Sequence, residues 1–370
     1  MTCPRLEEPE PQYDGLVPAP VCLIVNPSAG GGKAGRVAQE VERALREHGL
    51  EVGRVDTRDL SHARELAEEG ARAGETVVVL SGDGMIGVVA DVLRHFPGAL
   101  LGVLPGGRGN DLARVLGIPQ DPVAACAVIA DGVPRAMDLG EVGGCAEVEQ
   151  KAEPVQLGTA QAVAHGQAFV GIASAGFDSV ANRIANEAPA SLGNFVYAYG
   201  ALRALASWRP ARFEIELDPP GERLSFTAYT VGACNSKTYG GGMRAAPDAM
   251  LDDGLLEVVV LESIGKLAFL TKILPKVFKG THVELPSVHV FRAAEVEISA
   301  DRPFTMYADG DPIGELPVRV RAVHGAVSVL VPAGETVRDS AFSSPPLPSP
   351  AAVDGAAAPV AESTESSTDR

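Results

Sequence analysis

Short apolar runs alternate with amphipathic stretches along the first third of the chain. Residues 21–25 (VCLIV), 76–80 (TVVVL) and 99–104 (ALLGVL) are continuous apolar runs, each followed by a glycine-rich turn and a helical pattern. A further strand at 52–55 leads to a helical pattern at 61–73. Continuous apolar strands between helices are typical of a parallel sheet that is covered on both faces. The pattern predicts an α/β domain over residues 18–140.

The periodicity changes after residue 140, where strand-like runs follow one another with few helices between them. Turn residues separate these runs, which predicts a mostly antiparallel, β-rich domain over residues 141–334. The leader (1–17) is acidic and proline-rich, the tail (335–370) is acidic and rich in Ser, Pro and Ala, and both are predicted to be disordered. Residues 143–165 are predicted to form a solvated hairpin insertion. The strand-like runs lie at 212–218, 226–234, 255–261, 295–300, 304–310, 317–323 and 327–332.

Composition narrows the class of protein. A length of 370 residues suggests two domains, and the five scattered cysteines form no CxxC pair, which fits a reducing cytosol. The net charge of −17 disfavours nucleic-acid binding, which needs a positive surface. No secretory leader opens the chain, and no run approaches the roughly 18 apolar residues that span a bilayer. We therefore predict a cytoplasmic protein that is soluble or at most peripheral at a membrane.

Three glycine-rich turns lie where a predicted strand meets a predicted helix, at the edge of the sheet where ligands bind. Glycine lets the backbone approach an anion closely, and the following helix offers free N–H groups, to which Lys33 and Arg108 add charge-assisted donors. One such turn is more often a tight connection, but three on one edge predict a phosphate-binding rim. Its candidate residues are Asn26, Gly31, Gly32 and Lys33 in the first turn, Ser81, Gly82, Asp83, Gly84 and Met85 in the second, and Gly107, Arg108 and Asn110 in the third.

Two known phosphate-binding signatures fit these turns poorly. The first turn is not a P-loop, because Ala34 follows Lys33 where a magnesium-binding Ser or Thr would stand. The second turn matches the dinucleotide fingerprint as Gly82-x-Gly84-x-x-Gly87. That match falls on the third strand, and roughly 20 residues further on stands Arg108 rather than an acid. It leaves an NADP-dependent oxidoreductase as an alternative.

Four ordered motifs over about residues 20–333 resemble the diacylglycerol kinase catalytic-domain family, which includes bacterial lipid kinases and sphingosine kinases. They are SGDGM (81–85), PGGRGNDLARVLGIP (105–119), GGGMRAAPDAMLDDGLLEVVVL (240–261) and DGDPIG (309–314). The resemblance implies an NAD kinase-like α/β domain that binds ATP, a β-sandwich-like domain that binds the lipid, and an active site in the cleft between them. It implies transfer of the γ-phosphate of ATP to a lipid hydroxyl, with diacylglycerol as the first candidate acceptor and sphingoid or other long-chain lipids as alternatives.

The resemblance also implies roles for particular acids. Asp83, Asp111 and Asp138 would form an aspartate–water–Mg²⁺ network around the transferred phosphate, although Asp138 alone would fit a turn residue after a strand. Asp311, in the position of the family's D-G-E glutamate, would be the general base that accepts the lipid proton, although D-G also fits a hairpin turn. Thr57 would face the adenine or ribose, although alone it fits a helix entry. A structural Mg²⁺ site would use Asp253 and the carbonyls of Met250 and Leu255, with a simple turn as the alternative.

The chain departs from the family pattern at four functional positions. Ser81 and Met85 replace residues of the family's GGDGT, and Arg108 replaces the threonine of its GTxND. An arginine can make a bidentate phosphate contact in place of a hydroxyl contact. With Asp311 in place of glutamate, these departures leave a second alternative, a nucleotide- or lipid-binding sensor that has lost catalysis.

Residues 263–280 are a candidate amphipathic helix for an anionic membrane surface. The segment carries four lysines and no acid, with Leu267, Leu270, Ile273, Leu274 and Val277 on its apolar side. The alternative is that this apolar side packs on the sheet and only the lysines meet solvent. Exposed edge strands in the second domain would permit a homodimer.

Overall fold

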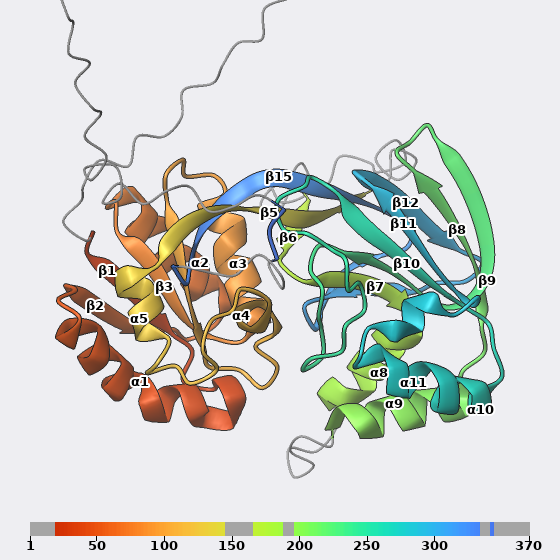
Figure 1. Cartoon of the computed structure of the whole chain (residues 1–370), viewed down its shortest axis with the longest axis horizontal. Helices are drawn as coiled ribbons and strands as arrows, with labels where there is room; N and C mark the ends of the chain where they lie inside the picture. Colours follow the sequence, from red (N-terminus) through yellow and green to blue (C-terminus); the bar gives the residue numbers. More distant parts are fainter. Residues whose placement is uncertain (1–18, 145–165, 188–195, 334–340, 344–370) are drawn as a thin grey trace, which may run out of the picture.

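The computed structural model describes residues 19–144, 166–187, 196–333 and 341–343. Figure 1 shows two lobes side by side, joined by strands that run across the top of the molecule. The predicted leader, nearly all of the predicted 143–165 insertion and most of the predicted tail lie outside the described residues. Among the described residues, no helix is long and apolar enough to cross a membrane.

The first lobe confirms the predicted α/β domain with a parallel sheet. Its strands follow the order β4-β3-β1-β2, and each is parallel to its neighbour. Nearly all side chains of the three inner strands are buried, because helices cover both faces. The elements are β1 (Val21–Val25), α1 (Ala29–Glu47), β2 (Val52–Asp56), α2 (Leu60–Arg72), β3 (Thr76–Ser81), α3 (Asp83–Leu93), β4 (Leu100–Pro105), α4 (Asp111–Val115) and α5 (Cys126–Asp131).

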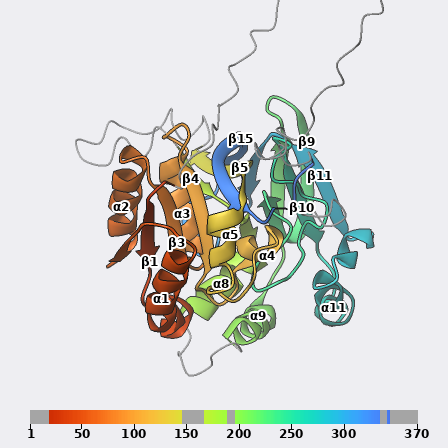
Figure 2. The same cartoon turned by 60° about the vertical axis from the view of Figure 1, so that its left-hand side comes forward.

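The second lobe is a mostly antiparallel sheet, as predicted, with helical segments along one edge, of which α8 and α9 were not predicted (Figures 1 and 2). Strands β6, β7 and β11 were also missed. The strands are β6 (Gln167–Phe169), β7 (Ile172–Gly176), β8 (Ala211–Leu217), β9 (Glu222–Cys234), β10 (Leu256–Glu262), β11 (Val288–Ala293), β12 (Glu295–Ala300), β13 (Thr305–Ala308) and β14 (Asp311–Glu315). The helices are α8 (Phe177–Glu187), α9 (Val196–Ser207) and a 3₁₀ turn (Thr281–Glu284).

Two long strands belong to both lobes, so the sheet continues without a break past residue 140, the predicted boundary. Strand β5 (Val133–Gly144) pairs along its length with β15 (Val318–Val331). The end of β15 also pairs in parallel with β4, and Val327 and Val329 pack in the core of the first lobe. The last strand of the chain therefore completes the first sheet. Such a return is a long-range pairing that local periodicity does not reveal.

The segment 263–280 is not one amphipathic helix. It consists of α10 (Lys266–Ala268), a π-helical turn (Phe269–Ile273) and α11 (Leu274–Val277). Ile273 and Val277 are buried, and Leu270 and Leu274 are half-buried, so most of the predicted membrane-facing side packs against the protein. Only Leu267 of that predicted set is well exposed. The four residues Leu270, Ile273, Leu274 and Val277 therefore follow the alternative interpretation, in which the apolar side packs against the protein.

A short part of the predicted tail is ordered against the first lobe. Ala341 and Phe342 are buried, and the Ala341 carbonyl accepts a hydrogen bond of 2.8 Å from the Leu251 amide. The Arg135 guanidinium lies 4.2 Å from the centre of the Phe342 ring. Residues 341–343 therefore belong to the folded body, and the prediction of a wholly disordered tail was wrong there.

Candidate active site

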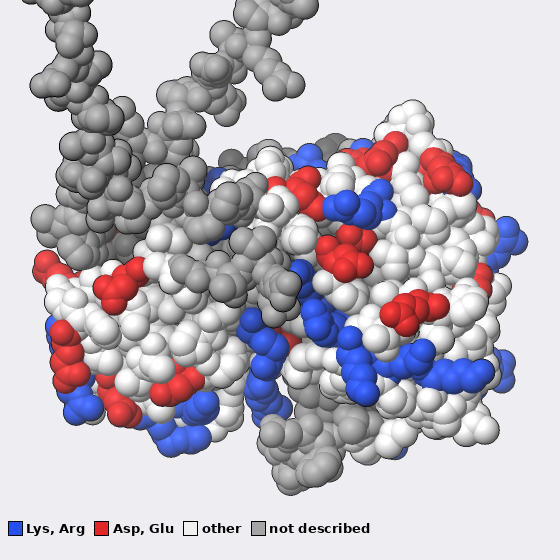
Figure 3. All heavy atoms as spheres, viewed as in Figure 1, with Lys and Arg blue, Asp and Glu red and all other residues white. Residues whose placement is uncertain are grey.

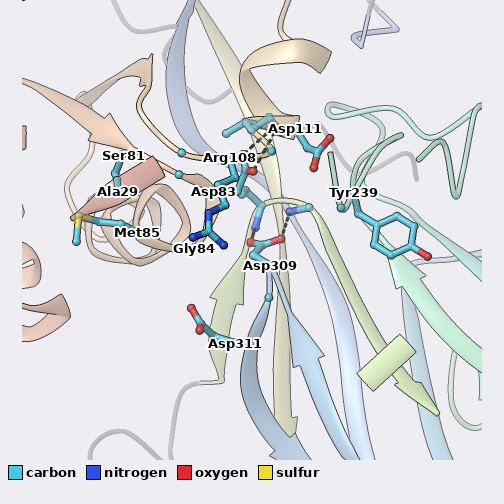
Figure 4. Close-up of a pocket in the computed structure, with 18 of the residues that line it drawn as sticks. Ala29, Ser81, Asp83, Gly84, Met85, Arg108, Asp111, Tyr239, Asp309 and Asp311 are labelled. Atoms are coloured by element: carbon cyan, nitrogen blue, oxygen red, sulfur yellow. Dashed lines mark hydrogen bonds between the residues drawn. The ribbon is translucent and has the colours of Figure 1, made fainter. Parts of the chain in front are cut away.

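A cavity of about 450 Å³ lies between the two lobes. The first lobe contributes the turns that follow β1, β3 and β4, and the second lobe contributes the β6–β7 turn, the segment 238–241 and the β13–β14 turn. The predicted rim and the predicted base thus face one space (Figure 4). Of the predicted site residues, those that line it are Asn26, Gly31, Ser81, Gly82, Asp83, Gly84, Met85, Gly107, Arg108, Asp111 and Asp311.

Close backbone packing explains the glycines in the second and third turns. A Cβ atom on Gly107 would lie 2.5 Å from the Cα atom of Gly82, so no larger residue fits without moving the turn. Asn110 holds this turn from outside the cavity. It adopts a left-handed φ of 51°, and its side-chain oxygen accepts a 2.7 Å hydrogen bond from the Gly107 amide. Asn110 therefore shapes the phosphate-facing backbone rather than lining it.

Asp83 connects the second turn to the third. Its two carboxylate oxygens each accept a hydrogen bond of 3.0 Å, one from the Asp111 amide and one from the Leu112 amide. These amides open helix α4, where free N–H groups favour a negative charge. Asp83 thereby fixes the position of Asp111.

Asp111 is buried and lies where the two lobes meet. Its Oδ2 atom accepts a 2.7 Å hydrogen bond from the Gly241 amide of the second lobe, whereas Oδ1 has no hydrogen-bond partner among the described residues. Burial raises the pKa of Asp111, and the nearby charge of Asp83 acts in the same direction. A buried carboxylate oxygen without a partner is the kind of atom that a bound cation would satisfy.

Asp309 is a site residue that the sequence interpretation missed. It adopts a left-handed φ of 51° and accepts hydrogen bonds from three successive amides of the β6–β7 turn, from Val170 at 2.8 Å, Gly171 at 2.9 Å and Ile172 at 3.3 Å. Burial raises the pKa of Asp309 to about 7, although these donors oppose the shift. The signal in the sequence was the D-G pair, which favours a residue with positive φ.

Asp311 begins β14 and lies at the mouth of the cavity. A Cβ atom on Gly84 would stand 2.9 Å from Oδ2 of Asp311, so the carboxylate closely approaches the second glycine-rich turn. Partial burial against this turn raises the pKa of Asp311. Figure 4 shows Asp311 and Asp309 on the second-lobe side of the cavity, with Arg108 reaching toward them from the third turn. The cavity therefore combines the cationic guanidinium of Arg108 with carboxylates, which are groups that can accept a proton or bind a metal ion.

Several predicted nucleotide-binding residues lie outside the cavity. Gly32 and Lys33 are on α1 beyond its lining, and Lys33 is exposed to solvent. Thr57 is buried, and its hydroxyl donates a 2.7 Å hydrogen bond to the Asp59 carbonyl at the start of α2. Thr57 therefore has the geometry of a helix-entry residue, which was the alternative to a contact with adenine or ribose.

Asp138 is not brought together with Asp83 and Asp111. Strand β5 continues past it to Gly144, so Asp138 does not end a strand at the ligand-binding edge. Its fully buried carboxylate accepts hydrogen bonds from the Gly254 amide at 2.6 Å and the Gly325 amide at 2.7 Å. The His324 Nδ1 atom lies 2.9 Å from Oδ1. These contacts give Asp138 a position at the junction of the lobes, outside the cavity lining, and its part in the magnesium network stays a prediction.

The predicted structural Mg²⁺ site at Met250, Asp253 and Leu255 does not fit a cation in this structure. Oδ1 of Asp253 accepts a 3.0 Å hydrogen bond from the Leu255 amide, and Oδ2 pairs with Arg292. The segment therefore has the geometry of a turn held by an ion pair. Among the described residues, no three His, Cys, Asp or Glu side chains form a ready metal site.

An apolar pocket of about 130 Å³ adjoins the polar cavity. The two share Ile172, Ser174 and Tyr239, so Tyr239 stands at the boundary between them. The other lining residues come mainly from α8, β9, β10 and the segment 269–277. The main polar group is Asp178, which accepts a 3.2 Å hydrogen bond from the Thr230 hydroxyl and another from Tyr239. Burial raises the pKa of Asp178 to about 6.

Tyr239 and Gly241 were also missed as site residues. Tyr239 precedes three glycines that all have positive φ, and Gly241 donates the hydrogen bond to Asp111. The run of glycines indicated an unusual backbone, but not what it would touch. That contact depends on how the second lobe packs against the first.

Comparison with known proteins agrees with this architecture. Residues 20–142 match the model of the diacylglycerol kinase catalytic domain, and residues 171–331 match the YegS C-terminal NAD kinase beta sandwich-like domain. A crystal structure of a diacylglycerol kinase from Bacillus anthracis has the same fold, with a TM-score of 0.64 at 20% identity, covering 87% of this chain and 100% of that one. The class is therefore a two-lobed protein with a catalytic α/β lobe and an NAD kinase-like β lobe.

Sequence relatives define the family. The diacylglycerol kinase of Mycobacterium tuberculosis strain H37Rv is 33% identical over 317 residues, which cover 84% of this chain and 95% of that protein. The diacylglycerol kinase of Bacillus subtilis is 26% identical over 314 residues, with coverage of 84% and 95%. This chain belongs to the diacylglycerol kinase family of lipid kinases. The membership supports the lipid-kinase prediction and not the NADP-dependent oxidoreductase.

Proposed function

We propose that the protein transfers the γ-phosphate of ATP to the hydroxyl of a membrane lipid, with diacylglycerol as the first candidate acceptor. The observation that carries this proposal is the adjacency of two different spaces. A polar cavity lined by glycine-rich turns and four carboxylates shares Ile172, Ser174 and Tyr239 with an adjoining apolar pocket. A polar headgroup reaction next to an apolar binding surface is what phosphorylation of a lipid needs.

ATP would lie with its phosphates along the turns of the first lobe. The start of α3 places the Gly82–Gly84 backbone in the cavity, where helix N–H groups favour anions. Arg108 lines the same space with an exposed guanidinium, in place of the threonine that the family pattern has there. The Asn26 amide donates a 3.3 Å hydrogen bond to the Ser81 hydroxyl, which joins the first turn to the second.

Asp311 is the proposed general base. It takes the proton of the lipid hydroxyl as that oxygen forms a bond to the γ-phosphorus and the bond from phosphorus to the β–γ bridging oxygen breaks, which releases ADP. Its raised pKa makes it a better proton acceptor than an ordinary carboxylate. Asp309 fixes the turn that carries Asp311 by its three hydrogen bonds to the β6–β7 turn.

Magnesium fits the phosphate end of the cavity. When bound, Mg²⁺ neutralises charge on the phosphate oxygens during transfer. Oδ1 of Asp111 accepts no hydrogen bond among the described residues, although Arg114 Nε lies 4.0 Å away, and it would be the protein ligand of Mg²⁺, with phosphate oxygens and waters completing the set. Asp83 holds Asp111 for this role through its backbone amide.

The acceptor would place its hydrocarbon in the apolar pocket and its hydroxyl beside Asp311. Diacylglycerol leads because the relatives named above are diacylglycerol kinases, and sphingoid or other long-chain alcohols are the alternatives. Such acceptors reside in membranes, so we propose that the protein works in the cytoplasm at the inner membrane surface.

The test is transfer of labelled phosphate from ATP to a panel of extracted lipids, with and without magnesium. The expected result is one labelled lipid class, lost when magnesium is chelated and lost in Asp111→Asn. Asp253→Asn, at the turn that does not fit a cation, is the matched control and should retain transfer. Measurable ATP binding without transfer to any lipid would instead support the sensor alternative.

A further inference from the structure

The segment 266–279 has two faces with different environments. Its inner face lines the apolar pocket through Phe269, Ile273 and Val277, all of which are buried. Its outer face carries two large apolar side chains in solvent, Leu267 at 75% exposure and Phe278 at 55%. Isolated exposed apolar residues are common, but these two belong to the segment that lines a pocket proposed for lipid.

The same outer face is basic in a strongly acidic protein. The chain has a net charge of −17, yet residues 263–283 contain four lysines and no acid. Lys272 and Lys279 are exposed, and none of the ion pairs formed among the described residues involves them. In Figure 3, Lys and Arg side chains gather over the region of α10 and α11.

Helix α9 extends this surface. Lys266 Nζ donates a 2.8 Å hydrogen bond to the Ala206 carbonyl, which joins α10 to α9. Leu202, Arg203 and Ala206 share one helical face at spacings of three and four residues, and Leu202 is 58% exposed. Residues 196–210 also contain no acid. We call the combined surface the docking face, and it comprises Leu202, Arg203, Lys266, Leu267, Lys272, Phe278 and Lys279.

We propose that the docking face binds an anionic lipid bilayer and so brings the acceptor pocket to the membrane. Leucine and phenylalanine would enter the boundary between headgroups and acyl chains while lysine and arginine contact anionic headgroups. A basic face with exposed apolar residues suits an anionic bilayer, because its lysine and arginine side chains attract the headgroups. The rest of the chain is acidic and would be repelled by the same membrane, so this face is the one that could approach it. The inference deepens the proposed function, on which it rests for the use of the pocket.

Co-sedimentation of the full chain with vesicles tests the proposal. Vesicles of phosphatidylcholine alone are compared with vesicles that also contain phosphatidylserine. Wild-type protein is expected to prefer the anionic vesicles, with binding that weakens as salt rises. Lys272→Gln with Lys279→Gln should weaken that binding by roughly tenfold to thirtyfold, since each lysine near an anionic surface contributes about 1 kcal/mol. Leu267→Ser should weaken it further.

Matched controls remove the same charge or the same kind of side chain elsewhere. Arg43→Gln with Arg72→Gln deletes two exposed cations of the first lobe. Val290→Ser replaces an exposed apolar residue on β11, away from the docking face. Both controls should bind as wild type does. Equal binding by the lysine variant and wild type, equal losses in the controls, or no preference of wild type for anionic vesicles would each overturn the proposal.

A water-soluble, short-chain diacylglycerol separates this proposal from the proposed function. The lysine variant should phosphorylate dissolved acceptor at the wild-type rate and lose activity only on vesicles. Loss on both would contradict a role in docking alone. If wild type phosphorylates no lipid in any form, the proposed function fails, while the vesicle-binding result still decides the docking face.

Discussion

Asp311 is the residue whose replacement tests the proposed proton transfer most directly, because its carboxylate lies against Gly84 at the cavity. Replacing it with asparagine keeps the shape and removes the proton acceptor. We expect Asp311→Asn to lower kcat by roughly a hundredfold to ten-thousandfold, the usual contribution of a general base. ATP affinity, measured by calorimetry, should be unchanged.

Two further variants sharpen this prediction. Asp311→Glu restores the side-chain length of the family pattern, and it should retain turnover if the side chain acts as a base. Glu315→Gln, at the other end of the same strand, is the matched control, and it should behave as wild type. Joint loss of ATP binding and turnover in Asp311→Asn would indicate a structural role instead.

Asp309 should give the protein a measurable pH dependence of stability. Burial raises its pKa from an ordinary 3.8 to about 7 in the folded chain. Between these values the folded state keeps a proton that the unfolded state has lost, so the free energy of unfolding falls as pH rises. The stabilisation that comes from the proton on Asp309 is complete below the pKa of the unfolded state, 3.8, and is lost above the pKa of the folded state, about 7. Asp309→Asn should remove this part of the slope, as urea unfolding over a pH series would show.

The free energy of unfolding is compared between wild type and Asp309→Asn at each pH, because other buried acids also make this free energy depend on pH. Burial raises the pKa of Asp178 as well, to about 6. Asp178 is unchanged in the Asp309→Asn variant and cancels in the difference. Parallel curves for wild type and variant would contradict a raised pKa at Asp309.

At the scale of elements, the apolar pocket should control which acceptors are used. Ala181 on α8 lines it, so Ala181→Trp fills space that the hydrocarbon would occupy. We expect a higher KM for long-chain acceptors, a smaller effect for short-chain ones, and no change for ATP. Steady-state kinetics over a series of acyl lengths measures this. Ala73→Trp, at the exposed end of α2 in the first lobe, is the control, and equal effects of both variants would argue against an acceptor site.

The elements also show what the sequence could and could not predict. Strands β1, β3 and β4 were predicted almost to the residue, because fully buried strands are continuous apolar runs bounded by turn residues. Helix α9 was missed, since its sequence VYAYGALRALAS is mostly apolar and shows neither strand alternation nor a clear polar face. The apolar side of segment 263–280, from Leu270 to Val277, was assigned the wrong environment, because periodicity reports an apolar face without saying what covers it.

The site was predictable where a motif carries its own geometry. Glycine-rich turns at strand ends must face the ligand edge of a parallel sheet, so Gly82, Gly107 and their neighbours were placed correctly. Asp309 and Tyr239 make their contacts with segments far away in the sequence, the β6–β7 turn and Asp178, and local sequence does not encode such contacts. Asp138 was misplaced because the sequence did not reveal that β5 continues beyond it.

On the scale of the whole molecule, one sheet runs through both lobes, from β14 at one edge to β2 at the other. β15 and β5 form the crossing, and β15 changes register between Val323 and Val327. The cavity lies between the two lobes that this crossing joins, so its two halves belong to one continuous hydrogen-bonded sheet. A homodimer through the edge strands stays a prediction.

We expect Asp138 to stabilise the crossing of β5 and β15 rather than to act as a catalytic acid. Its buried carboxylate accepts from Gly254, before β10, and from Gly325, at the bend of β15. Asp138→Ala leaves these buried donors without an acceptor, so we expect the free energy of unfolding to fall by about 3 kcal/mol or more. Asp138→Asn keeps one accepting oxygen and should lose less. Urea unfolding measures the stability, and ATP affinity and turnover per folded molecule should match wild type at low temperature. An Asp138→Ala protein of normal stability that fails to transfer phosphate would instead restore the role in the magnesium network that the sequence predicted.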